Sequence, residues 1–145
     1  MWVIFEGLDK AGKTTLEWEF LKATNFKHMV IDRGPVGYLV FDKLFNRSTK
    51  LGDQEFIHQA RKIMKSGDFM VVYCTVEKDH AAARLLAHNE ECPYDYAKAQ
   101  KLYRDAIHRY YYGKKVLEVD TTFLSVERCV ELIIEKLEEV QKGEL

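Results

Sequence analysis

Residues 7–15 read GLDKAGKTT and fill every fixed position of the phosphate-binding pattern G-x-x-x-x-G-K-[ST]. A short apolar run, residues 2–5, comes directly before them, and a helical pattern begins at about Lys13. Loop amides and the positive end of the helix dipole then point at one anion, because the glycines let the backbone turn and approach closely. A chance glycine-rich turn is the alternative, and the flanking strand and helix disfavour it. The stretch predicts a nucleoside triphosphate site on a strand–loop–helix unit.

Each residue type in this loop has its own use. Lys13 is expected to place a positive charge at the terminal phosphates, and the Thr14 hydroxyl is expected to bind Mg²⁺. The full set of loop residues predicted to contact the triphosphate is Gly7, Asp9, Lys10, Ala11, Gly12, Lys13, Thr14 and Thr15.

The composition is that of a globular protein. The chain has 145 residues, of which 47% are apolar, and we expect one domain over residues 1–145. No apolar run approaches the roughly 20 residues of a membrane span, and no signal-peptide layout is present. Of the three cysteines, Cys74 and Cys129 lie in apolar patterns, and no C-x-x-C spacing occurs. We therefore expect core packing for these two thiols, a cytoplasmic location, and neither zinc nor disulfides.

The formal net charge of −1 argues mildly against a protein that binds nucleic acid through overall electrostatic attraction. One stretch, residues 98–115, interleaves basic side chains with tyrosines that could stack on bases. Its members are Lys98, Lys101, Tyr103, Arg104, His108, Arg109, Tyr110, Tyr111, Tyr112, Lys114 and Lys115. We favour the alternative of a solvated helix face whose tyrosines pack against the core. Binding of nucleic acid is possible on this view but not favoured.

Short β-rich runs alternate with helical patterns along the chain. We expect strands at 2–5, 28–31, 69–75 and 115–119, and helices at 13–24, 36–45, 53–66, 77–88, 94–111 and 125–140. Asp53 is the predicted N-cap of the third helix, and Gly67 is placed to end it. Apolar strands separated by helices predict a parallel sheet that is covered on both faces. Ligands of such sheets bind at the carboxyl ends of the strands.

The residues at the carboxyl ends of the predicted strands exclude some classes of nucleotide-binding protein. No N-K-x-D segment follows a strand, so nothing indicates guanine recognition, and residues 69–75 end without the carboxylate of a mechanical ATPase. The second strand instead ends in Asp32-Arg33. An aspartate there can orient Mg²⁺-bound water, and an arginine can fork onto a phosphate. A strand-end turn with a surface ion pair is the alternative, which the neighbouring phosphate loop makes less attractive.

Four segments resemble thymidylate kinases, in the family's order, over residues 2 to about 140. The loop at 7–15 is similar to theirs in carrying an acidic and a basic residue. Asp32-Arg33 resembles the family's strand-end Asp-Arg, and Tyr94-Asp95 resembles the Tyr-Glu that follows its lid. Residues 119–122, Val-Asp-Thr-Thr, resemble the last-strand stretch that contacts adenine. The loop is specific for phosphate binding, whereas the other three matches are weak singly.

The resemblance implies ATP and Mg²⁺ as cofactors and assigns roles to matched positions. Lys13 would bridge the ATP phosphates, and Thr14 and Asp32 would place the metal. Arg33 would bind the phosphate of the acceptor, and Asp9 would face its 3′-hydroxyl. A third group would line the nucleotide sites, with Arg84 stacking on adenine, Thr121 beside it and Tyr94 on the acceptor side. For Arg84, an ordinary helix-surface arginine is an equal alternative.

The predicted lid lacks cations. Residues 88–95 contain no lysine or arginine, although phosphoryl transfer spreads negative charge that needs a cationic partner. Lys10 in the phosphate loop is the best substitute, which resembles the family branch that keeps its catalytic cation there. The predicted catalytic set is therefore Lys10, Lys13, Asp32 and Arg33, with a solvated loop lysine as the alternative for Lys10.

The resemblance fails on the acceptor side. Asp32 comes only 19 positions after Lys13, which leaves no room for the edge strand and helices that the family inserts there. The Glu-Pro turn and the arginine that read thymine are lost with them. We expect the acceptor site to be rebuilt from Tyr38, Phe41, Arg47 and the helix around Gln59, or to stay open to a larger acceptor. The missing strand is the outer one, which predicts a three-layer P-loop kinase fold with four parallel strands in the order 2-1-3-4.

The sequence thus predicts a truncated, thymidylate kinase-like P-loop nucleoside monophosphate kinase. It would transfer the ATP γ-phosphate to a nucleotide-type acceptor, a deoxynucleoside monophosphate above all, and its partners would be small-molecule nucleotides. One alternative is a kinase acting on a polynucleotide or on a modified base in DNA. Another is a non-catalytic module that signals ATP occupancy, which the retained loop residues and Asp32-Arg33 oppose.

Overall fold

The fold was obtained as a computed structural model, which describes residues 1–111, 113 and 115–143. Four strands form one sheet: β1 (Trp2–Glu6), β2 (Met29–Asp32), β3 (Phe69–Thr75) and β4 (Val116–Asp120). All neighbours are parallel, and the order is β2-β1-β3-β4, which confirms the predicted 2-1-3-4 sheet. The central strands β1 and β3 are almost wholly buried, as expected for a parallel sheet with helices on both faces.

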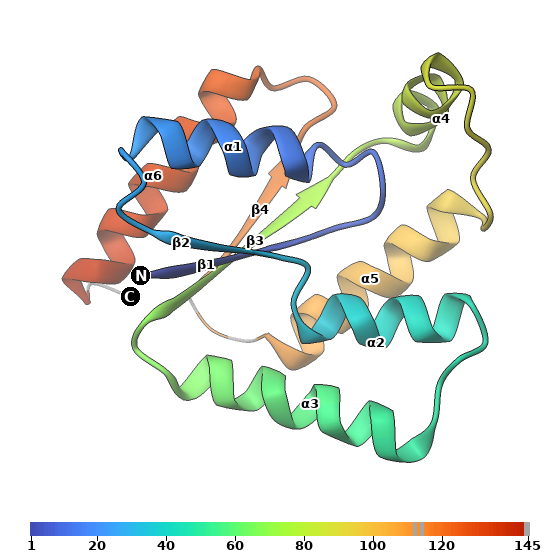
Figure 1. The fold of residues 1–145 in the computed structure, drawn as a ribbon, viewed down its shortest axis with the longest axis horizontal. Coiled ribbons are helices and arrows are strands. Elements are labelled where there is room, and N and C mark those ends of the chain that lie inside the picture. Colours follow the sequence, from blue (N-terminus) through green and yellow to red (C-terminus); the bar gives the residue numbers. More distant parts are fainter. Residues whose placement is uncertain (112, 114, 144–145) are drawn as a thin grey trace.

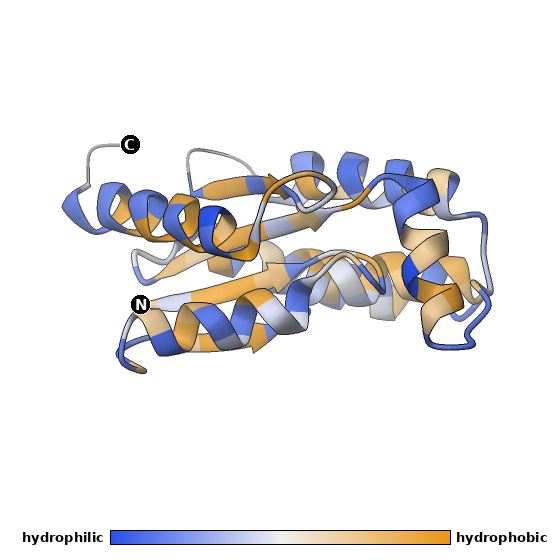
Figure 2. Ribbon diagram, turned by 90° about the horizontal axis from the view of Figure 1, so that it is seen from above, coloured by the Kyte–Doolittle hydropathy of each residue, from blue (hydrophilic) through white to orange (hydrophobic). Residues whose placement is uncertain are grey.

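Helices cover the two faces unequally (Figure 1). On one face, α1 (Lys13–Ala23) packs against α6 (Val126–Lys142). On the other, α2 (Pro35–Leu44) packs against both α3 (Lys50–Lys65) and α5 (Tyr96–Tyr110). The short α4 (Lys78–Ala87) lies beyond the carboxyl ends of the strands. Hydrophobic stretches lie along the strands and on the helix sides that face them, with polar residues outward (Figure 2).

Predicted helix boundaries were wrong in three helices, of which the last ends at Lys142 and not at residue 140. The third helix begins at Lys50 because the Thr49 hydroxyl, and not Asp53, caps it by accepting the Gly52 N–H at 3.0 Å. It ends at Lys65, where Ser66 turns into extended backbone before Gly67 is reached. The helix predicted from residue 94 begins at Tyr96, since the Asp95 carboxylate caps it through the Lys98 N–H at 3.1 Å.

The predicted core roles of two cysteines and two tyrosines are confirmed. Cys74 and Cys129 are free thiols and buried. Tyr103 and Tyr111 are also buried, so they pack against the core instead of facing solvent beside the basic residues. Tyr112 and Lys114 of the same stretch lie outside the described residues.

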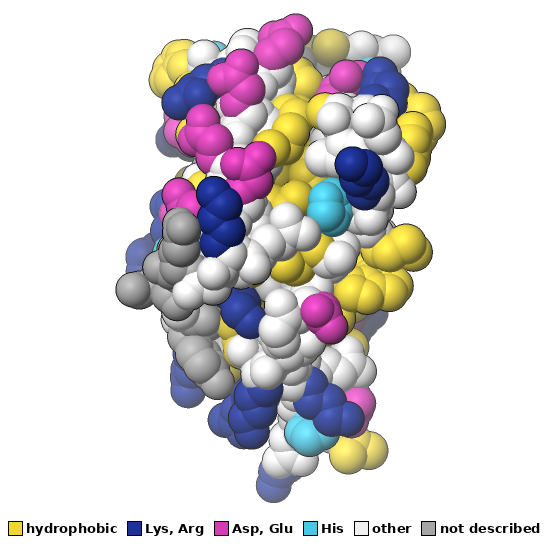
Figure 3. All heavy atoms as spheres, turned by 90° about the vertical axis from the view of Figure 1, so that its left-hand side faces the viewer, with side chains coloured by type: hydrophobic (Ala, Val, Ile, Leu, Met, Phe, Trp, Pro, Cys, Tyr) yellow, Lys and Arg dark blue, Asp and Glu magenta, His cyan; other side chains and the backbone are white. Residues whose placement is uncertain are grey.

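The surface mixes both charges. On the face shown in Figure 3, acidic side chains gather over α6 at the upper left, and basic ones gather below, over α3. Among the described residues, no helix has the length and hydropathy that a membrane crossing requires.

Candidate functional site

The loop between β1 and α1 has the geometry of an anion site. Gly7 has φ +145°, and a Cβ there would lie 2.5 Å from the Cys74 carbonyl oxygen, so only glycine fits. Gly12 occupies the N-cap of α1 in a left-handed conformation, with φ +86°. Among the described residues no side chain caps this helix, which leaves its first-turn N–H groups for a ligand. The loop is therefore shaped to receive a phosphate group.

Lys13 is held inside the loop. Its side chain is buried, and Nζ donates to the Gly7 carbonyl at 2.8 Å and lies 3.4 Å from the Leu8 carbonyl. These carbonyls keep a full positive charge at the centre of the anion site. Thr14 and Thr15 follow on the exposed first turn of α1.

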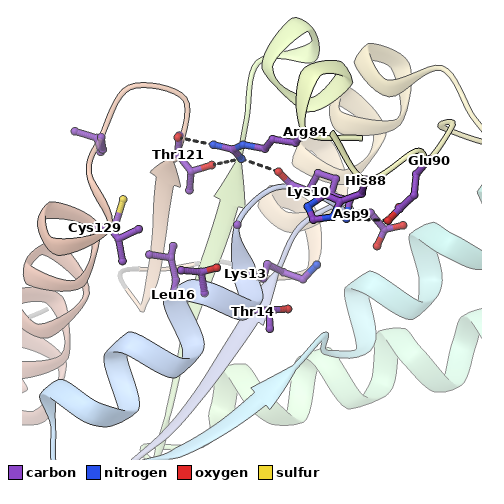
Figure 4. A pocket seen from close by; sticks show the side chains of 14 residues that line it. Asp9, Lys10, Lys13, Thr14, Leu16, Arg84, His88, Glu90, Thr121 and Cys129 are labelled. Atoms are coloured by element: carbon purple, nitrogen blue, oxygen red, sulfur yellow. Dashed lines mark hydrogen bonds and ion pairs between the residues drawn. The ribbon is translucent and has the colours of Figure 1, made fainter. Parts of the chain in front are cut away.

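A cavity of about 750 Å³ opens in front of the loop (Figure 4). Residues predicted to contact the triphosphate line one part of it: Asp9, Lys10, Gly12, Lys13, Thr14 and Thr15. Leu124, Val126 and Cys129 form an apolar end near the start of α6. A polar cradle that continues into an apolar pocket suits a phosphorylated molecule with a flat, apolar part. The apolar residues were not predicted, since their run resembles any loop that leads into a helix.

Arg84 lies in this cavity and is not an ordinary helix-surface arginine. Its Nη1 donates to the Lys10 carbonyl at 2.7 Å and lies 3.2 Å from the Thr121 hydroxyl, while Nη2 donates to the Thr121 carbonyl at 3.0 Å. The Thr121 hydroxyl lies 2.9 Å from the carbonyl oxygen of Ala11 and 3.0 Å from that of Thr75. Arg84 and Thr121 thus join α4 and the end of β4 to the loop, as the dashed lines in Figure 4 show.

Lys10 points into the same cavity. It adopts a left-handed conformation, with φ +66°, and Nζ lies 3.2 Å from Glu90 Oε1. The Lys10 side chain is only 24% exposed. This ion pair connects the loop with the segment that follows α4, and Figure 4 shows both side chains together with Asp9 and His88. Glu90 belongs to the predicted lid at residues 88–95, and no local pattern in the sequence indicates its pairing with Lys10.

Asp32, at the end of β2, has an acidic neighbour that the sequence patterns did not reveal. Glu17 lies one turn after Lys13 on α1 and is within hydrogen-bonding reach of the Asp32 carboxylate. Burial, followed by the bond to Asp32 and its charge, raises the pKa of Glu17 to about 8, while Lys13 opposes the rise. The only available signal was the four-residue spacing from Lys13.

These groups fit a magnesium ion. Glu17 Oε1 is buried without a hydrogen-bond partner among the described residues, and the carboxylates of Glu17 and Asp32 lie together. In the part of the chain that the structure describes, no group of three or more acidic, histidine or cysteine residues could hold a metal. Mg²⁺ does not need such a cage, because it usually keeps waters and binds one or two carboxylates together with substrate phosphates.

Arg33 lies beside the phosphate loop among aromatic rings. It adopts a left-handed conformation, with φ +65°, which is strained for a residue with a side chain. The guanidinium carbon lies 3.9 Å from the Phe41 ring centroid, and Nη2 lies 3.6 Å from Asp9 Oδ1. Its Nε is buried with no partner among the described residues. The structure therefore holds a cation with a spare donor next to the phosphate loop.

Tyr94 completes this side. Its ring contacts Phe41, Phe45 and Tyr96, with centroids 6.0 to 6.4 Å apart. Burial, followed by the nearby Asp9 charge, raises the pKa of Tyr94, so the phenol stays neutral. Asp9, Arg33 and Tyr94, three residues predicted to bind the acceptor, are thus brought together.

Tyr38 lies elsewhere. It stacks on Phe56 of α3, with ring centroids 5.8 Å apart, and lines a second cavity of about 490 Å³. This mainly apolar cavity runs between β2 and α3, and its polar lining residues are Asp32, Arg33, Tyr38, Gln59 and Lys62, so Arg33 borders it as well as the phosphate loop. The residues suggested for a rebuilt acceptor site are therefore divided, because Phe41 is buried under Arg33 while Tyr38 and Gln59 line the second cavity. Arg47 forms an ion pair with Asp42 at 3.5 Å instead.

Glu6 is a buried polar residue that the sequence patterns did not single out. It ends β1, directly before Gly7, and both of its oxygens accept hydrogen bonds from tyrosine hydroxyls. In the sequence it looks like the last residue of an apolar strand, so nothing indicated a buried network.

The chain has the fold of the P-loop nucleotide kinases. It superposes on the YorR protein of Bacillus subtilis, solved with phosphorylated GDP, with a TM-score of 0.75 and 17% identity over 98% of both chains. A deoxyadenosine kinase of M. mycoides, bound to dCMP and dCDP, gives a TM-score of 0.68 and 18% identity, covering 96% of this chain and all of that one.

A thymidylate kinase of Candida albicans shows the same fold at larger sequence distance. Its TM-score is 0.64 at 10% identity, over 97% of this chain and 92% of that one. No protein-family model matches the chain, and no curated protein matches it by sequence. The likeness to thymidylate kinases predicted from the motifs is thus confirmed at the level of the fold.

Proposed function

We propose that this chain is a Mg²⁺-dependent kinase that transfers the γ-phosphate of ATP to a nucleotide-type acceptor, a deoxynucleoside monophosphate above all. The observation that carries this proposal is the short distance between two phosphate-binding groups: the loop that lines the cavity of about 750 Å³, and the Arg33 guanidinium, whose Nη2 lies 3.6 Å from the loop residue Asp9. A donor phosphate and an acceptor phosphate can be held there face to face. Phosphoryl transfer requires mainly such positioning and charge neutralisation.

On the donor side, the triphosphate occupies the loop 7–15, with Lys13 at its terminal phosphates. The adenine extends toward the apolar end at Leu124, Val126 and Cys129. The donors of Arg84 are already directed at Lys10 and Thr121, so the face of its guanidinium remains to stack on the base. Thr14 and Asp32, with Glu17 beside them, would hold Mg²⁺, which neutralises phosphate charge when it is bound.

On the acceptor side, the outer nitrogens of the Arg33 guanidinium bind the phosphate of the monophosphate, and Asp9 faces the sugar. An oxygen of that phosphate attacks the γ-phosphorus, the bond to the β–γ bridging oxygen breaks, and ADP leaves. A phosphate oxygen is already ionised near pH 7, so this step needs no general base. Lys10 lies where the migrating group passes and supplies positive charge to it.

The polynucleotide alternative has lost two of its tyrosines, while Tyr110 stays half-buried with the Arg109 guanidinium 5.5 Å from its ring centroid. Tyr103 and Tyr111, which were candidates to stack on bases, are buried and bonded to Glu6. Lys98, Lys101 and Arg104 remain as a basic face, although Arg104 is paired with Glu118 at 2.8 Å. We therefore include oligonucleotides among the acceptors to be tested, although a monophosphate is the proposed acceptor.

The test is a screen for ADP release with ATP and Mg²⁺. Candidate acceptors are deoxynucleosides, their 5′-monophosphates and short single-stranded oligonucleotides, each measured with and without EDTA. We expect turnover with at least one monophosphate, suppressed by EDTA. Turnover only with oligonucleotides, with a steep dependence on salt, would move the assignment to a nucleic-acid kinase. Absence of ADP with every acceptor, while ATP still binds in a fluorescence titration, would leave a non-catalytic module.

A further inference from the structure

Glu6 joins the end of β1, where the phosphate loop begins, to the helices behind Arg33, and it lines neither of the two cavities. It is the last residue of β1, its side chain is fully buried, and the phosphate loop begins at the next residue. The role described above for the loop does not use its carboxylate. A buried carboxylate is costly unless donors surround it, so its partners indicate what it holds in place.

The donors come from two different helices of the acceptor-side layer. The Tyr103 hydroxyl of α5 donates to Oε1 at 2.6 Å, and the Tyr111 hydroxyl, just after α5, donates to Oε2 at 2.8 Å. The Gly37 N–H, in the first turn of α2, donates to Oε2 at 3.1 Å. Burial raises the pKa of Glu6, and the bonds from both tyrosines and from the Gly37 and Gly34 amides oppose that rise.

The start of α2 is wrapped closely around this carboxylate. A Cβ on Gly37 would lie 2.5 Å from Glu6 Oε1 and 2.5 Å from the Tyr103 hydroxyl. A Cβ on Gly34 would lie 2.6 Å from the Tyr111 hydroxyl and 3.0 Å from Glu6 Oε2. Both glycines are therefore needed for close approach. The residue immediately before this wrapped segment is Arg33, whose strained backbone needs support from its surroundings.

We infer that Glu6 is a positioning residue for Arg33: its buried carboxylate locks the first turn of α2 to the end of β1, which keeps the Arg33 guanidinium over Phe41 and beside Asp9. Glu6 itself touches no substrate. Its kinetic consequence rests on the proposed function, whereas the lock itself does not. Loosening it should therefore weaken capture of the acceptor phosphate while the ATP side, which is built from α1 and α4, stays in place.

The test uses Tyr111→Phe and Glu6→Gln in the full chain, with Tyr73→Phe as the matched control. Tyr73 is equally buried and stacks on Tyr103, but its hydroxyl donates to the Gln100 carbonyl at 3.3 Å and makes no hydrogen bond to Glu6, so the control removes a hydroxyl next to the network and not from it. The acceptor is the monophosphate that turns over fastest in the screen. We expect its KM to rise roughly tenfold in both Glu6-network variants, since each loses a charge-assisted bond, while the KM for ATP changes less than about twofold. Tyr73→Phe should leave both constants unchanged.

Amide hydrogen exchange without ligand provides the second readout, which does not depend on activity. The Gly37 and Tyr38 amides should exchange faster in both network variants, with the amides of α1 unaffected. Equal rises of both KM values, or exchange that accelerates equally in α1, would overturn the inference, because either result means general loosening. If the wild type phosphorylates no acceptor, the proposed function fails, and the exchange pattern alone still decides whether Glu6 locks α2. Tyr111→Phe retains the Glu6 carboxylate, so the test survives if Glu6→Gln does not fold.

Discussion

The phosphate-loop side and the Arg33 side of the candidate site hold their positive charges in different ways. The phosphate-loop side presents backbone amides, Lys13 and exposed threonines to an open cavity of about 750 Å³. The Arg33 side holds its guanidinium between the Phe41 ring and Asp9, close to a cluster of aromatic rings. The first arrangement depends on one continuous stretch of chain, and the second depends on the packing of α2 and α5 against β1. We therefore expect changes on the two sides to have separable kinetic effects.

The largest expected effect tests the loop side. Lys13→Ala removes the buried cation at the terminal phosphates, and we expect kcat to fall by at least about a hundredfold. Lys22→Ala on the same helix, where the lysine is exposed and paired with Glu19, is the matched control and should keep wild-type turnover. Rates come from ADP release, and thermal melting checks the fold. A folded Lys13→Ala protein with normal turnover would refute the assignment.

The next effect tests the acceptor side. Arg33→Ala should lower kcat/KM for the acceptor by about a hundredfold, because the phosphate loses a forked, charge-assisted contact. Arg33→Lys should recover only part of that loss, since an ammonium cannot form the fork. Initial rates at varied acceptor and varied ATP separate the two sides. A defect confined to the KM for ATP would contradict the assignment of Arg33 to the acceptor.

A pH dependence sharpens the comparison at the paired carboxylates of Glu17 and Asp32. The pKa of Glu17 is raised to about 8, so the native protein binds a proton there that the unfolded chain releases near its usual value. The stability contributed by this proton is present below about pH 4.5 and is lost as the pH rises toward 8.

The measurement is thermal unfolding in EDTA from pH 5 to 8, with Glu17→Gln as the comparison. The melting temperature of the wild type should fall by a few degrees more across this range than that of the variant. Mg²⁺ should reduce the difference at high pH, because the ion competes with the proton for the Glu17 carboxylate. Identical pH profiles of the two proteins would show that Glu17 titrates normally.

The smallest expected effect concerns the ion pair between Lys10 and Glu90. Half of the Glu90 side chain is exposed, so the pair contributes at most about 1 kcal/mol to the free energy of unfolding. Glu90→Gln frees Lys10 for the phosphates, and we expect the KM for ATP to fall by up to about fivefold at low salt and to stay unchanged at high salt. An unchanged KM for the acceptor is the control. A tenfold loss of kcat would mean that Glu90 has a further task beyond pairing with Lys10.

Most of the donor side could be predicted because its signals are local. Gly7, Gly12 and Lys13 lie within seven residues of one another, and their roles follow from the turn and the helix start that the pattern itself imposes. The sheet order also followed from the sequence, since the interval between Lys13 and Asp32 is too short for another strand and crossover. The sequence left it undecided whether Arg84 lies at the nucleotide site or on an ordinary helix surface, and only its contacts with Lys10 and Thr121 show that it lines the cavity.

The acceptor side could be predicted only in part, because tertiary packing decides it. Arg33 and Tyr94 were named from short motifs, but nothing local indicated that Tyr38 would stack on Phe56 of α3 and line a second cavity. Glu6 and Glu17 were missed for the same reason, since burial and partners from distant helices give these carboxylates their character. By itself the sequence determined the phosphate loop and the parallel sheet, which depend on short-range backbone geometry and hydrophobic periodicity. The tertiary structure alone decided which distant side chains share a desolvated environment, and this sets their charge, orientation and reach.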